Sequence, residues 1–212
     1  MLLQNRIAKK LNKKVVKELG EGSQGTAYLL NDNTVMKVTK QESEYYTSTD
    51  LVGKSYKYIC KIYATYRVKH DNTESFVIIQ EFLDTSVYQR LKDFESTVDT
   101  PKYIFNYFRR AINRGFHKKD SKKYVDVIKK NKAKYSIFKW EFEQYQKIAK
   151  ASVRIGITNS DMFACNIGMR DGHLVLFDLG YNNSHSSSEG SVINLPIKVS
   201  LMNKIKKLRY IH

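Results

Sequence analysis

The feature that most constrains the fold is a glycine-rich segment near the N-terminus. The segment G-E-G-S-Q-G, residues 20–25, follows a β-type run that begins at Val15 and leads into a second such run, residues 26–30. The composition of residues 31–33 predicts a turn, and residues 34–38 read as a third strand. Because a strand rather than a helix follows the glycines, the pattern favours a hairpin over the dinucleotide-binding fingerprint.

The glycines of this hairpin have a chemical consequence. Gly20, Gly22 and Gly25, with Ser23 between them, carry no side chains that would keep an anion away from the backbone. Backbone N–H groups in such a hairpin approach phosphates closely. A lone G-x-G-x-x-G is weak evidence, however, because glycines also mark ordinary tight turns.

Lys37 lies between apolar neighbours in the third predicted strand. A buried lysine needs an anionic partner to remain charged. Glu42 and Glu44 both follow within seven residues, on a helix predicted over residues 41–57, and Glu44 is the expected partner because apolar residues surround it. The alternative is that Lys37 and Glu44 are unconnected surface charges.

A second group of polar residues lies between positions 155 and 180. Asp161 precedes Asn166 by five positions, residues 170–173 read as a hairpin turn, and the apolar run 174–177 reads as a strand that ends at Asp178. Asp178 opens the triplet D-L-G.

In their order and spacing these motifs resemble the protein-kinase-like superfamily, in which a catalytic-loop Asp, an Asn, a hairpin and an Asp-Phe-Gly element follow one another. The resemblance spans residues 18–180. It implies a two-lobed α+β fold. Residues 1–84 would form a small antiparallel β N-lobe that ends at the hinge, and residues 85–212 a truncated, mainly helical C-lobe with the catalytic loop and D-L-G.

The resemblance also implies a role for each motif residue. Asp161 would orient or deprotonate the attacking hydroxyl, and Asn166 and Asp178 would hold Mg²⁺. Lys37, positioned by Glu44, would bind the α- and β-phosphates of ATP under the glycine-rich loop.

Residues 76–84 resemble the fifth strand and the hinge of the same family. The backbone at Glu81 and Leu83 would then hydrogen-bond the adenine edge, and Gln80 would occupy the gatekeeper position.

Several residues depart from the family pattern. Asn159 and Ser160 stand where His-Arg usually precedes the catalytic Asp, which predicts activity without activation-loop phosphorylation. Phe163 replaces a common lysine, which makes a slow enzyme or a pseudokinase more plausible. Only 32 residues follow Gly180, with a helix predicted at about 196–210, so the usual peptide platform is mostly missing.

Charge distinguishes the two halves of the chain. The net charge is +16, and residues 102–154 alone carry 16 basic and 4 acidic side chains among interleaved aromatics. Helical apolar spacing there predicts two or three amphipathic helices, with Thr100 capping one that starts at Pro101. The basic face is either solvated or a surface for nucleic acid or an acidic partner.

The two cysteines do not suggest a disulfide or a metal site. Cys60 and Cys165 are far apart and fit no C-x-x-C pattern, and the five histidines show no zinc spacing. We expect Cys165 to be a small packed residue rather than a nucleophile. The sequence lacks a signal-peptide run and a membrane span, so we expect a cytoplasmic protein, in the host cytoplasm if the source is viral.

The sequence therefore predicts an ATP- and Mg²⁺-dependent phosphotransferase, with a small serine/threonine protein kinase as the first hypothesis. A small-molecule or RNA kinase of the same fold is an alternative. A pseudokinase scaffold that grips nucleic acid or an acidic protein through residues 102–154 is another.

Overall fold

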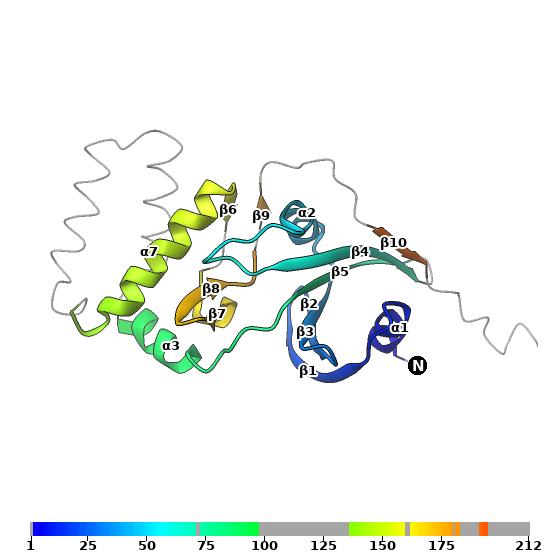
Figure 1. Ribbon diagram of the computed structural model, residues 1–212, viewed down its shortest axis with the longest axis horizontal. Helices are drawn as coiled ribbons and strands as arrows, with labels where there is room; N and C mark the ends of the chain where they lie inside the picture. Colours follow the sequence, from blue (N-terminus) through cyan, green and yellow to red (C-terminus); the bar gives the residue numbers. More distant parts are fainter. Residues whose placement is uncertain are drawn as a thin grey trace, which may run out of the picture.

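The computed structural model describes residues 2–70, 73–97, 136–159, 162–179, 181–182 and 191–194. Figure 1 shows a twisted sheet with helices α1 and α2 beside it, and a second part in which α3 and α7 flank short strands. Among the described residues there are four α-helices and a sheet whose first five strands are antiparallel. The predicted α+β class is thus confirmed at this level.

The sheet contains the predicted glycine-punctuated strands in the order β1-β2-β3-β5-β4. Apolar residues of β2, β3 and β5 alternate towards a buried face, and the predicted turn at residues 31–33 closes the β2–β3 connection with Asn33 at φ +60°. The five strands are β1 (Val15–Gly22), β2 (Gly25–Leu30), β3 (Thr34–Thr39), β4 (Ile62–His70) and β5 (Thr73–Glu81).

A sixth strand, β10 (Ser191–Asn194), extends the sheet by pairing in parallel with β4, so that Ser191 lies opposite Tyr66. The sequence did not indicate this strand, because the polar residues that precede it carry no strand pattern. The helix predicted near residues 196–210 and the helix start at Thr100 and Pro101 lie outside the described residues.

Two helices pack against the sheet. α1 (Leu3–Lys10) buries Ile7 and Ala8 in a cluster with apolar side chains of β2, β3, β4 and β5. α2 (Glu42–Leu51) is shorter than the predicted helix over residues 41–57, and that prediction is wrong in its C-terminal part. Gly53 has φ +74°, a left-handed conformation that ends a helix and that glycine adopts without strain.

The second part is built around α3 (Tyr88–Thr97) and α7 (Lys139–Arg154). α7 confirms one amphipathic helix within residues 102–154, and the rest of that region up to residue 135 lies outside the description. The short elements that follow are β6 (Ile157–Asn159), the 3-10 turn η1 (Ala164–Asn166), β7 (Ile167–Arg170), β8 (His173–Leu176) and β9 (Tyr181–Asn182).

One apolar core joins the two parts. Ile62 and Ile78 from the sheet belong to the same buried cluster as Phe94 of α3 and Tyr145 of α7. None of the described helices is long and apolar enough to cross a membrane. This core holds β5, η1 and β8 together, and β3 is joined to it through its pairing with β5. The candidate site lies on β3, on η1 and at the end of β8.

Candidate functional site

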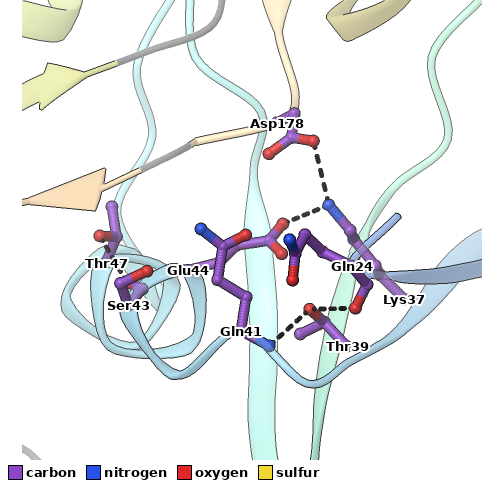
Figure 2. Close-up of polar contacts among 8 residues, drawn as sticks. All are labelled: Gln24, Lys37, Thr39, Gln41, Ser43, Glu44, Thr47 and Asp178. Atoms are coloured by element: carbon purple, nitrogen blue, oxygen red, sulfur yellow. Dashed lines mark hydrogen bonds and ion pairs between the residues drawn. The ribbon is translucent and has the colours of Figure 1, made fainter. Parts of the chain in front are cut away.

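The candidate site centres on Lys37, which lies on β3 opposite Ala27 of β2 and Ile78 of β5. Its Nζ donates to Glu44 Oε1 at 2.5 Å and to Asp178 Oδ2 at 3.2 Å. Figure 2 shows the three side chains pointing towards one another from β3, α2 and the segment after β8. We call these three residues the Lys37 cluster. Glu44, rather than Glu42, is the partner of Lys37, as predicted.

Burial sets the electrostatics of the Lys37 cluster. The Glu44 side chain is only 2% exposed, and its second carboxylate oxygen has no hydrogen-bond partner among the residues that the structure describes. Burial raises the pKa of Glu44, and the Lys37 ammonium offsets only part of that effect. Burial also disfavours the charged form of Lys37, but Glu44 and Asp178 together outweigh it and raise the pKa of Lys37. The lysine is therefore charged at neutral pH.

The charge balance of the Lys37 cluster matters for ligands. One ammonium is shared between two carboxylates, and Asp178 is the accessible member, with 32% of its side chain exposed. An anion that took over the Lys37 contact would leave Asp178 unpaired, which would then favour a cation beside it. The cluster can thus accommodate a phosphate and a metal ion together more readily than a phosphate alone.

Asn166 lies next to Asp178 because the β7–β8 hairpin brings them together. The register pairs Ile167 with Leu176, and beyond it the Phe177 N–H donates to the Asn166 carbonyl oxygen at 3.0 Å. The turn of this hairpin is at Asp171 and Gly172, as predicted, and both have positive φ.

These two residues fit a magnesium site of the open kind. Within the described parts of the chain, no three Asp, Glu, His or Cys side chains are grouped as for a metal held by protein alone. Mg²⁺ commonly takes only one or two carboxylates together with phosphate oxygens. Asn166 and Asp178 carry oxygen donors of this type on adjoining backbone segments, whereas Asp161 and Gly180 lie outside the described residues.

The glycine-rich hairpin is tied to the end of β3 next to Lys37. Gly22 pairs with Gly25, and the Gln24 carbonyl oxygen accepts from Thr39 Oγ1 and Lys40 N, both at 3.0 Å. Figure 2 shows Gln24 beside Lys37. Ser23 completes the two-residue tip.

Gly20 and Gly25 are glycines for different reasons. A Cβ on Gly25 would lie 2.2 Å from the Val38 carbonyl oxygen, so packing against β3 excludes any side chain there. A Cβ on Gly20 would meet nothing within 4 Å. Gly20 lines a cavity, which is consistent with close approach of a ligand at that position.

The cavity has a volume of about 470 Å³ and lies between the glycine-rich hairpin, the connection from β5 to α3, and η1. Its walls are largely apolar. Gln80 is 6% exposed. The lining residues are Leu19, Gly20, Ala27, Val35, Gln80, Glu81, Phe82, Leu83, Thr85, Tyr88, Ala164, Cys165 and Phe177. Val35 is two positions from Lys37, and Phe177 immediately precedes Asp178. The cavity therefore adjoins the Lys37 cluster.

The predicted hinge residues border this cavity, and one of them has a further role. Glu81 N donates to the Lys61 carbonyl oxygen at 3.0 Å, and the Glu81 carbonyl oxygen accepts a weak contact from Cys60 Sγ at 3.9 Å. The Glu81 carboxylate accepts from Lys61 N at 2.9 Å and from Arg170 Nη1 at 2.5 Å. Arg170 Nη2 also donates to the carbonyl oxygens of Tyr56 and Lys57.

Sequence reasoning missed this Glu81–Arg170 ion pair. The partners are 89 positions apart, and Arg170 stands in a hairpin where a basic residue would ordinarily face water. The signal available in the sequence was a glutamate at the end of an apolar strand, because a charge that is buried there needs a partner.

The prediction for Cys165 was wrong. Its side chain is exposed and lines the cavity, and the packed residue of the turn is Ala164, at 3% exposure. Phe163 is also exposed, at 52%. The segment after Asp161 thus presents an aromatic ring and a thiol.

Comparison of the sequence with protein-family models and with curated proteins gives no match.

Proposed function

We propose that the protein is an ATP- and Mg²⁺-dependent phosphotransferase of the protein-kinase-like superfamily, most simply a small serine/threonine protein kinase. The observation that carries the proposal is the Lys37 cluster. Three residues that the motif pattern selected from separate segments, with Lys37 and Asp178 141 positions apart, are in hydrogen-bond contact. Unconnected surface charges would have no reason to converge in a largely buried position.

The cavity supports ATP as the phosphate donor. Its apolar walls suit a planar base, and the backbone at Glu81 and Leu83, which both line the cavity, would supply an acceptor and a donor to the base edge. The cavity runs from these groups to the residues that adjoin Lys37 and Asp178. A nucleotide in this orientation would place its phosphates under Gly20, Gly22, Ser23 and Gly25.

The chain's own groups would act by positioning and by neutralising charge. Lys37, held by Glu44, would bind phosphate oxygens, and Asn166 and Asp178 would hold Mg²⁺, which supplies compensation for the phosphate charge when bound. Asp161 would orient the acceptor hydroxyl or take its proton. Catalysis of this kind needs little covalent chemistry from the protein.

The acceptor and the partner surface are further parts of the proposal. A protein hydroxyl is the first candidate, and a small molecule or RNA hydroxyl is the alternative that the net charge of residues 102–154 favours. The exposed Phe163, in place of a common lysine, favours a third function, a nucleotide-binding scaffold with weak or no catalysis.

The test is phosphate transfer from γ-labelled ATP with Mg²⁺, with total cell protein and total RNA as separate acceptors. Wild type should label one acceptor, and Asp161→Ala and Lys37→Met should not. Labelled RNA or a labelled small molecule would replace the protein-kinase hypothesis. Nucleotide binding by wild type without transfer or hydrolysis would support the scaffold, and no nucleotide binding at all would refute the proposal.

A further inference from the structure

The carboxylate of Glu95, on α3, lies where three elements meet behind the candidate site. Its Oε1 accepts from Tyr145 Oη of α7 at 2.8 Å and from the backbone N–H of Ala164 at 2.7 Å. Neither the motifs nor the family resemblance assigns a role to this residue. Both contacts span long sequence separations, 50 and 69 positions, so the folded core creates them.

The Ala164 contact satisfies a group that the local sequence leaves open. Ala164 begins η1, and the residue before it, Phe163, provides no side-chain cap for the turn. The first N–H groups of a helical turn have no partner inside the turn, and Ala164 is buried from water. Glu95 therefore supplies from α3 the cap that Phe163 cannot provide.

Tyr145 fixes the Glu95 carboxylate in turn. Tyr145 is fully buried and its ring lies 5.2 Å from that of Phe94, the neighbour of Glu95. Burial raises the pKa of Tyr145, so its hydroxyl keeps the proton that it donates to Glu95. Burial also raises the pKa of Glu95, and the hydrogen bonds from Tyr145 and Ala164 oppose that shift.

The capped turn leads directly to the residues that would hold the metal. Asn166 is the last residue of η1, its N–H donates to the Phe163 carbonyl oxygen at 2.8 Å, and its own carbonyl oxygen accepts from Phe177 N. A shift of Ala164 would thus move Asn166 against Asp178. Partners one layer behind a metal ligand commonly change metal affinity by about 10- to 100-fold when they are removed.

We propose that Glu95 is a positioning residue of the phosphotransfer site, which caps the Ala164–Asn166 turn and so holds Asn166 in place beside Asp178. The inference rests on the proposed function. What matters is the position of an acceptor oxygen, since an amide oxygen at the same place would accept the same two hydrogen bonds. Negative charge by itself is not the requirement.

Four variants separate position from charge. Glu95→Gln keeps the oxygen and loses the charge, whereas Glu95→Asp keeps the charge and withdraws the oxygen by one methylene. Glu95→Ala removes both. Asp93→Ala is the matched control, because Asp93 is an exposed carboxylate on the same helix.

The first measurement is hydrogen exchange of the backbone amides of residues 164–166, which needs neither ligand nor activity. Exchange should be about tenfold faster in Glu95→Asp and Glu95→Ala, and close to wild type in Glu95→Gln and Asp93→Ala. If Glu95→Ala does not fold, Glu95→Asp carries the comparison. Equal exchange in Glu95→Asp and wild type would overturn the inference.

The second measurement is the Mg²⁺ concentration that gives half of the maximal phosphate-transfer rate. It should rise about tenfold in Glu95→Asp and stay near wild type in Glu95→Gln, while ATP affinity without metal is unchanged in both. An active wild type with no change in Glu95→Asp would overturn the inference alone. A wild type that neither binds Mg·ATP nor transfers phosphate would overturn the proposed function, and with it the role of Glu95.

Discussion

Replacing Lys37 by methionine tests whether the Lys37 cluster is a buried ionic unit. The substitution keeps most of the side-chain volume and removes the ammonium, so the almost fully buried Glu44 carboxylate loses its partner. Breaking a buried pair from one side costs about 3–5 kcal/mol. Because the Lys37 side chain is 17% exposed, we expect the unfolding free energy to fall by an amount near the lower end of this range, about 3 kcal/mol at pH 7.

The pH dependence follows from the direction of the Glu44 pKa shift. Burial already raises the pKa of Glu44 with Lys37 present, and without Lys37 the largest influence that opposes burial is gone. The folded variant then binds the Glu44 proton more tightly than the unfolded chain does. Its destabilisation should therefore be fully present above the raised pKa and should shrink as pH falls towards the ordinary carboxyl range.

The assay is urea unfolding at pH 7 and pH 5. Lys13→Met is the matched control, because Lys13 pairs with Asp32 at the surface, where an ion pair contributes under about 1 kcal/mol. Adding Glu44→Leu to Lys37→Met should recover about 2 kcal/mol, since it removes the stranded charge. A Lys37→Met variant as stable as Lys13→Met, or one with no pH dependence, would refute the reasoning.

Three further predictions concern the cavity and its surroundings. Gly25→Ala should lower the unfolding free energy by about 3 kcal/mol, because its Cβ would overlap the β3 backbone. Gly20→Ala should leave stability unchanged and weaken nucleotide binding. Equal melting temperatures for the two variants would contradict this prediction. A thiol reagent should label Cys165 in the folded protein but Cys60 only after unfolding, because Cys60 is buried and burial raises the pKa of its thiol. Mass spectrometry identifies the labelled residue. Arg170→Leu should cost about 3 kcal/mol in urea unfolding by stranding the buried glutamate at the end of β5, and a loss below about 1 kcal/mol would argue against that ion pair.

The part of the site that the sequence predicted depends on local pattern. Lys37 has apolar neighbours in its strand, and the apolar residues of the following helix favour Glu44 over Glu42 as its partner, which the burial of Glu44 confirms. The end of α2 was also predictable, because Gly53 is an ordinary helix-stop signal that the predicted range passed over.

Other parts depend on contacts that no local pattern encodes. β10 pairs with β4 more than 120 positions away, and its short segment has no period of its own. Arg170 and Glu95 likewise acquire their roles from partners on distant elements. The expectation that Cys165 is packed follows from the usual burial of cysteine, but in this turn the buried position belongs to Ala164.

The central claim is that the Lys37 cluster and the adjoining cavity bind a nucleotide together with Mg²⁺. Calorimetric titration of a non-hydrolysable ATP analogue, with and without Mg²⁺, tests it in wild type and in Asp178→Asn. We expect one site per chain, at least tenfold tighter with Mg²⁺ in wild type, and a Mg²⁺ effect that disappears in Asp178→Asn while metal-free affinity persists. No binding to wild type, or the same Mg²⁺ effect in Asp178→Asn, would contradict the claim.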